Sequence, residues 1–121
     1  MGFMLKRDDL ITFIKDRKYY DGSEIILWGN VKNTRRAFVV LIFNQTGLLT
    51  LPITPSGKIE GSILITEHHE IRSVRFKKGI LSYKLIVDSV TYDVPPFHVN
   101  KIMIGYKPQQ EELARLLNKY S

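Results

Sequence analysis

The chain has 121 residues, of which 44% are hydrophobic and 25% are charged, a balance that fits one globular domain and excludes a disordered chain or a second core. It contains no cysteine, which excludes disulfide bonds, thiolate metal ligands and a cysteine nucleophile. Eighteen Lys and Arg against twelve Asp and Glu give a net charge of +6, which favours anionic partners such as acidic lipid surfaces, acidic proteins or nucleic acid.

Segments that would direct the chain into or across a membrane are not predicted. Residues 1–9 lack the apolar run followed by small residues that marks a signal peptide. The longest unbroken apolar run, residues 37–43, is far shorter than the ~20 residues that a membrane-spanning helix needs. We therefore expect a cytoplasmic protein with no transmembrane segment.

A first helix is predicted over about residues 8–18. Asp8 or Asp9 is suited to be its N-cap, and Gly22 follows as a stop. The apolar side of this helix consists of Leu10, Ile11, Phe13 and Ile14. Two roles stay open for the helix, either a flank that covers a barrel end or a contact surface for a partner.

Most of residues 24–99 alternates with period two or forms short apolar blocks, as β-strands do. Seven strands are predicted, at residues 24–31, 36–44, 48–53, 62–66, 72–76, 80–87 and 90–94. The apolar block at 36–44 indicates a central strand that is buried on both faces. Pro52 cannot donate a ladder hydrogen bond, so it should lie at a sheet edge or a strand end.

The strongest local signal is a hairpin with Lys77, Lys78 and Gly79 as its three-residue loop and Gly79 in the left-handed conformation. In the strand that follows, Leu81, Tyr83, Leu85 and Val87 are predicted to point to the core. Pro95 and Pro96 are predicted to end the sheet. A final helix over about residues 108–120 carries one apolar stripe, formed by Leu113, Leu116, Leu117 and Tyr120.

The strand order, the segment EIRSVRFKKGIL at residues 70–81 and the segment QQEELARLL at residues 109–117 resemble the bacterial pleckstrin-homology-like (PH-like) domains, relatives of the GRAM group. The resemblance spans roughly residues 24–120. It implies a mainly β (α+β) fold, an antiparallel barrel of about seven strands capped by a C-terminal helix, with the helix at 8–18 as an addition. Residues 1–121 would then form a single domain that binds lipids, peptides or partner proteins without catalysis.

Two basic clusters are the candidate anion-binding residues. Lys32, Arg35 and Arg36 lie between the first two strands, where lipid-binding PH domains resemble this chain in holding phosphates with basic residues. Arginine grips phosphate oxygens bidentately, and lysine adds a point charge. Lys77 and Lys78 form the second cluster. At one barrel end the two clusters would make an anion-facing surface, and at opposite ends they would be ordinary solvated charges.

No catalytic residue, metal site or cofactor is predicted. The segment Glu67-His68-His69-Glu70, read as a strand, puts only two ligands on each face, fewer than a catalytic zinc needs. The sequence contains neither a nucleophile elbow nor a phosphate-cradling glycine loop.

The sequence therefore predicts a non-enzymatic binding module that recognises a partner protein or an anionic surface through its loops. One alternative is a small basic barrel that binds nucleic acid, which we consider less favoured. The other is an oligomeric structural or regulatory protein that buries the block at 36–44, or the first helix, between subunits.

Overall fold

The computed structural model describes residues 5–31 and 38–120. The seven strands are β1 (Ile25–Val31), β2 (Phe38–Phe43), β3 (Gly47–Ile53), β4 (Leu64–Glu67), β5 (Ile71–Lys78), β6 (Ser82–Ser89) and β7 (Phe97–Asn100). The helices are α1 (Arg7–Asp16), the single 3₁₀ turn η1 (His68–Glu70) and α2 (Gln109–Lys119). Within the described ranges, no helix is long and apolar enough to cross a bilayer.

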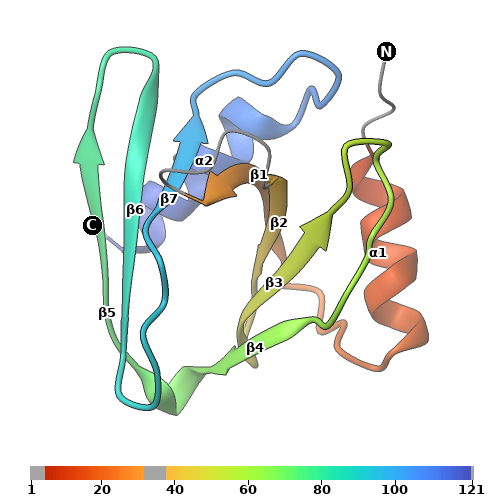
Figure 1. Ribbon diagram of the computed structural model, residues 1–121, viewed down its shortest axis with the longest axis horizontal. Helices are drawn as coiled ribbons and strands as arrows, with labels where there is room; N and C mark the ends of the chain where they lie inside the picture. The colour runs from red at the N-terminus through yellow and green to blue at the C-terminus, as the bar shows by residue number, and fades with distance from the viewer. Residues whose placement is uncertain (1–4, 32–37, 121) are drawn as a thin grey trace.

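All seven strands belong to one antiparallel sheet in the order β4-β3-β2-β1-β7-β6-β5. Two meanders, β1–β4 and β5–β7, are joined, among the described residues, by the pairing of Asn30 with His98 and of Val31 with Phe97. The sheet bends so that the two meanders face each other, and it stays open between the edge strands β4 and β5 (Figure 1). The mainly β class with a helix at each end is confirmed, and the arrangement is consistent with a PH-like fold.

The predicted seventh strand is wrong. Residues 90–96 form an extended connection, and the seventh strand is instead β7, which follows Pro95 and Pro96. The prolines therefore precede the last strand and do not end the sheet. The Tyr92 side chain points inward, and its hydroxyl contacts the hydroxyl of Thr66. The alternating pattern around Tyr92 therefore arises without a neighbouring strand.

One hydrophobic core lies between the two meanders and α2. It contains the side chains of one face of β1–β3 together with those of β6 and β7, among them Leu27, Leu41, Leu85 and Phe97. From α2, Leu113 and Leu116 are buried in this core, and Leu117 and Tyr120 pack against it. The predicted apolar stripe of the last helix is therefore confirmed.

The expectation of a single core is wrong, because the same domain has a second core on the opposite face of β1–β3, where α1 packs with Leu10 and Ile14. The block at Phe38–Phe43 alternates between the two cores, for instance with Leu41 in the first and Ile42 in the second. Burial on both faces is therefore confirmed, and α1 belongs to the fold. Its predicted cap is wrong, because Lys6 is the N-cap and the Asp9 carboxylate accepts the Lys6 N–H at 3.0 Å from within the first turn.

The β5–β6 hairpin turns two residues later than predicted, at residues 79–81. Lys77 and Lys78 belong to β5, and the Gly79 N–H donates to the Ser82 carbonyl at 2.8 Å. Gly79 does not adopt the left-handed conformation. The tip consists of Ile80 and Leu81, so Leu81 is exposed and does not point to the core.

Candidate binding surface

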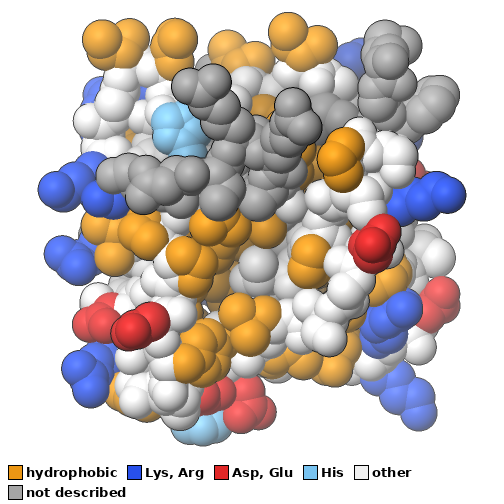
Figure 2. Space-filling view, in the orientation of Figure 1, with side chains coloured by type: hydrophobic (Ala, Val, Ile, Leu, Met, Phe, Trp, Pro, Cys, Tyr) orange, Lys and Arg blue, Asp and Glu red, His pale blue; other side chains and the backbone are white. Residues whose placement is uncertain are grey.

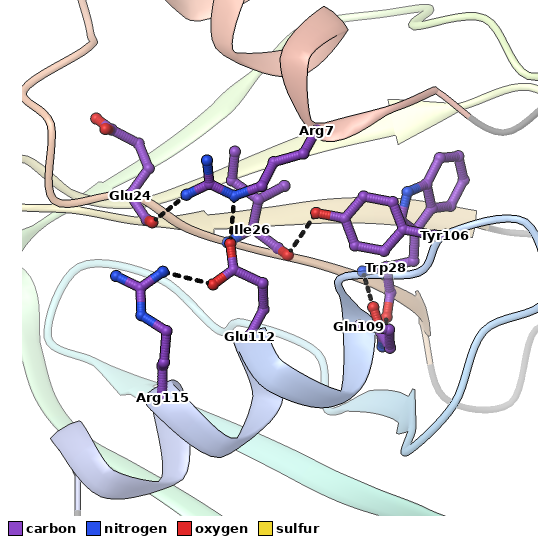
Figure 3. A network of polar contacts seen from close by, with 8 residues as sticks. All are labelled: Arg7, Glu24, Ile26, Trp28, Tyr106, Gln109, Glu112 and Arg115. Carbon is purple, nitrogen blue, oxygen red and sulfur yellow. Dashed lines mark hydrogen bonds and ion pairs between the residues drawn. The ribbon is translucent and has the colours of Figure 1, made fainter.

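A polar network joins α2 to β1 (Figure 3). Strand β1 pairs with β7 only at its end, so the remaining edge of β1 has no neighbouring strand. Side chains supply its hydrogen bonds: the Trp28 N–H donates to Gln109 Oε1 at 2.9 Å, and Gln109 Nε2 donates to the Trp28 carbonyl at 2.9 Å. The Tyr106 hydroxyl likewise donates to the Ile26 carbonyl at 2.9 Å.

Glu112 is the charged centre of this network. Its carboxylate is only 3% exposed and accepts hydrogen bonds from Arg7 Nε at 2.5 Å and Arg115 Nη1 at 2.6 Å. Burial alone would lower the pKa of Arg7, but the contact with Glu112 outweighs it and raises that pKa above its ordinary value. The network therefore holds α1, β1 and α2 together.

The predicted basic residues separate into two groups. Lys32, Arg35 and Arg36 lie outside the described residues. Lys77 and Lys78 lie at the end of β5, both exposed, next to the hairpin tip.

Beside this tip lies the connection between β7 and α2. The Lys101 N–H donates to the Leu81 carbonyl at 3.0 Å, and Lys101 Nζ donates to the Ile80 carbonyl at 2.8 Å. The Lys101 ammonium also lies 5.4 Å from the centre of the Tyr83 ring. One lysine thus holds the hairpin tip and this connection together.

The two tied segments carry the most exposed aliphatic side chains among the described residues: Ile80 (91%), Leu81 (79%), Ile102 (68%) and Ile104 (94%). We call these four residues the aliphatic end. In Figure 2 hydrophobic side chains stand along the upper rim of the molecule, over the β5–β6 tip and the connection to α2, and Lys and Arg side chains flank the side over β5. An exposed apolar group rimmed by charge is typical of an interaction site.

The charge around the aliphatic end has one sign. Residues 71–87 contain five basic residues (Arg72, Arg75, Lys77, Lys78 and Lys84) and no Asp or Glu. Residues 94–110 contain Lys101 and Lys107 and no Asp or Glu. This end of the molecule is therefore suited to an anionic partner.

Glu67 is the last residue of β4, and His68–Glu70 form the turn η1 between β4 and β5. The turn brings possible ligand atoms of Glu67, His69 and Glu70 within 4.8 Å of one another. Hydrogen bonds from the Thr91 hydroxyl and the Glu67 N–H lower the pKa of Glu70, and they fasten the turn to the chain that follows β6. The three side chains are thus engaged in local contacts that explain their proximity.

Sequence reasoning missed the aliphatic end. The available signal was that Ile80 directly follows Gly79 and Ile104 directly precedes Gly105, because glycine marks a turn in which its neighbours need not face the core. Similarity to known proteins adds nothing to this description: no family model, curated protein or solved structure matches the chain.

Proposed function

We propose that the protein is a non-enzymatic, PH-like binding module that docks on an anionic membrane surface through the aliphatic end. The observation that carries the proposal is the pair of hydrogen bonds from Lys101, which holds two exposed aliphatic loops at one end of the molecule. Anionic lipids are concentrated in the cytoplasmic leaflet, so we place the protein at the cytoplasmic face of a membrane.

The physical argument combines an apolar and an electrostatic contribution. Burying one Leu or Ile side chain fully contributes roughly 1.5–3 kcal/mol, and four such side chains are available at the aliphatic end. A basic residue close to an anionic bilayer adds about 1 kcal/mol. The contribution of each residue is modest, and the apolar and electrostatic contributions together supply the two signals that stable membrane anchoring usually takes.

The proposal is tested by flotation of the pure protein with vesicles. The protein should float with phosphatidylcholine vesicles that contain phosphatidylserine and stay unbound with phosphatidylcholine alone. The double variant Ile80→Ser/Leu81→Ser should weaken binding by about tenfold or more, which corresponds to ~1.4 kcal/mol. The matched control is Leu64→Ser, since Leu64 is 40% exposed on β4 and lies outside the aliphatic end.

Two results would overturn the proposal. One is the absence of binding to anionic vesicles at low salt, where the electrostatic attraction is strongest. The other is an equal loss of binding in the Leu64→Ser control. Oligonucleotide binding that persists in the double variant, without vesicle binding, would assign the basic surface to nucleic acid instead.

A further inference from the structure

We infer that a depression on the outer face of β5–β7, directly beside the aliphatic end, binds a phosphate monoester through Lys77, Lys84 and His98. The inference rests on the proposed function in one respect, because the monoester it assigns is the headgroup of a lipid in the bound membrane. A soluble phosphate monoester offers the same chemistry to the depression, and the experiment below separates the two sources.

The three ligand side chains form a row across three strands. Lys77 pairs with Lys84 in the β5–β6 ladder, and Lys84 pairs with His98 in the β6–β7 ladder. Their neighbours Leu85 and Phe97 are in the core, so the row faces outward. Because adjacent strands are about 4.8 Å apart, three cationic or hydrogen-bonding groups lie within reach of one small anion.

Two lysines directly opposite each other are an unusual choice for a sheet, since like charges at paired positions reduce its stability. The three strands, all of them described, contain one acidic residue, Asp88. It lies four positions along β6 from Lys84, about 13 Å away at the usual rise of a strand. The sheet therefore places two lysines side by side, with His98 next to them on β7.

The residues of this row line a depression in the surface. The depression has a volume of about 260 Å³, and its lining includes the three side chains together with Lys78, Gly79 and Ser82. The Ser82 hydroxyl adds a donor that needs no charge. The hollow opens next to Ile80, so a headgroup bound in it would be placed at the depth where the aliphatic end meets the bilayer.

The number and type of donors indicate a monoester. A phosphate monoester has three terminal oxygens and carries a charge between −1.5 and −2 near pH 7, as a phosphorylated side chain does. A phosphodiester has two terminal oxygens and one charge, and a carboxylate has the same charge in a planar group. The two ammonium groups, the imidazole and the hydroxyl match the phosphate monoester best. It offers them the most oxygens and the highest negative charge, and lysine binds phosphate as a point charge.

The experiment compares vesicles with equal zeta potential, one set containing phosphatidic acid and the other phosphatidylserine. The wild-type protein should bind the phosphatidic acid vesicles about tenfold more tightly. Lys84→Gln and His98→Gln should each remove this preference and retain binding to phosphatidylserine. The control Arg72→Gln makes the same change of charge on β5 outside the depression, and it should weaken both sets equally.

Soluble glycerol 3-phosphate tests the pocket without a membrane. It should shift the backbone amide resonances of Lys77, Lys84 and His98 in the wild type and leave them unmoved in Lys84→Gln. Thermal unfolding checks that Lys84→Gln is folded, so that a loss of the amide shifts reports the loss of the ligand and not unfolding.

Equal binding of the wild type to the two vesicle types would overturn the inference and leave the proposed membrane docking intact. A preference that survives Lys84→Gln would overturn it as well. Amide shifts with glycerol 3-phosphate and no vesicle binding would support the phosphate pocket, assign it a soluble ligand, and refute the membrane docking alone.

Discussion

Gln109 on α2 and Trp28 on β1 exchange two hydrogen bonds, one in each direction, between a side-chain amide and a backbone. The Trp28 N–H donates to Gln109 Oε1, and Gln109 Nε2 donates to the Trp28 carbonyl, both at 2.9 Å. The same Nε2 donates to the Asn100 carbonyl at 2.9 Å. One amide group thus takes the place of a residue from a neighbouring strand at the point where β1 and β7 separate.

Gln109→Leu should lower the free energy of unfolding by about 3 kcal/mol or more, because it leaves buried backbone groups of Trp28 and Asn100 without partners. Urea unfolding followed by tryptophan fluorescence measures the change. Gln110→Leu is the control, since Gln110 is the exposed neighbour on the same helix. Equal stability of the two variants would contradict this account of the β1 edge.

Arg7→Met should lower the free energy of unfolding by about 3 kcal/mol, because it removes an ion-pair partner from the buried Glu112 carboxylate. The double variant Arg7→Met/Glu112→Leu should lose less than the sum of the two single variants. Arg115→Gln should cost no more than about 1 kcal/mol, since the Arg115 side chain is 47% exposed. Additive losses in the double-mutant cycle would argue against coupling of Arg7 and Glu112.

Gly47→Ala should destabilise the protein severely, by more than about 3 kcal/mol, as overpacking against rigid backbone does. Gly47 has a φ of +138°, and a Cβ there would meet the backbone of Thr66 and lie 2.8 Å from the His68 nitrogen. Gly22→Ala should cost only about 1–2 kcal/mol, because Gly22 has a φ of +91° but no atom within 4 Å of the added Cβ. Thermal unfolding of the two variants tests the contrast, and similar melting temperatures would refute it.

The free energy of unfolding should fall as the pH rises above 10, the ordinary pKa of tyrosine. Burial, and then the charge of Glu112, raise the pKa of Tyr106, so this side chain stays protonated in the folded protein where the unfolded chain ionises. Below pH 10 both states are protonated and the contribution is fully present. Above it, each such tyrosine adds a slope of about −1.4 kcal/mol per pH unit until the folded pKa is reached.

Burial also raises the pKa of Tyr120, which adds to the same slope. Tyr106→Phe should therefore show a shallower alkaline decline than the wild type, although it also loses the hydrogen bond to the Ile26 carbonyl. Urea unfolding at several values between pH 9 and pH 12 measures the slopes. Identical slopes in the two proteins would contradict the raised pKa of Tyr106.

Side-chain periodicity predicted most of the sheet and both helices, because the direction in which a side chain points is a local property of the chain. It does not show which strand lies beside another. Residues 90–94 alternate without a partner, whereas β7 is only four residues long, follows two prolines, and pairs with residues of β1 that lie 66 and 68 positions earlier in the chain. That pairing depends on how the two meanders close over the core.

The tip of the β5–β6 hairpin was misplaced for a related reason. Lys77, Lys78 and Gly79 have the composition of a turn, but the ladder register is set by core pairs such as Phe76 with Leu85 and Val74 with Val87. This register keeps both lysines in the strand and moves Ile80 and Leu81 to the tip. Lys77 and Lys78 therefore remain a predicted basic cluster, whereas their apolar neighbours Ile80 and Leu81 were assigned to the wrong place.

Because a side chain of α2 completes the hydrogen bonding of β1, the edge of β1 stays incomplete during part of protein synthesis. Trp28 leaves the ribosome 81 residues before the glutamine that completes its hydrogen bonding. During that interval the nascent strand displays an incomplete edge, which neighbouring chains can join. The edge of β1 is therefore completed only after Gln109 on α2 has been synthesised.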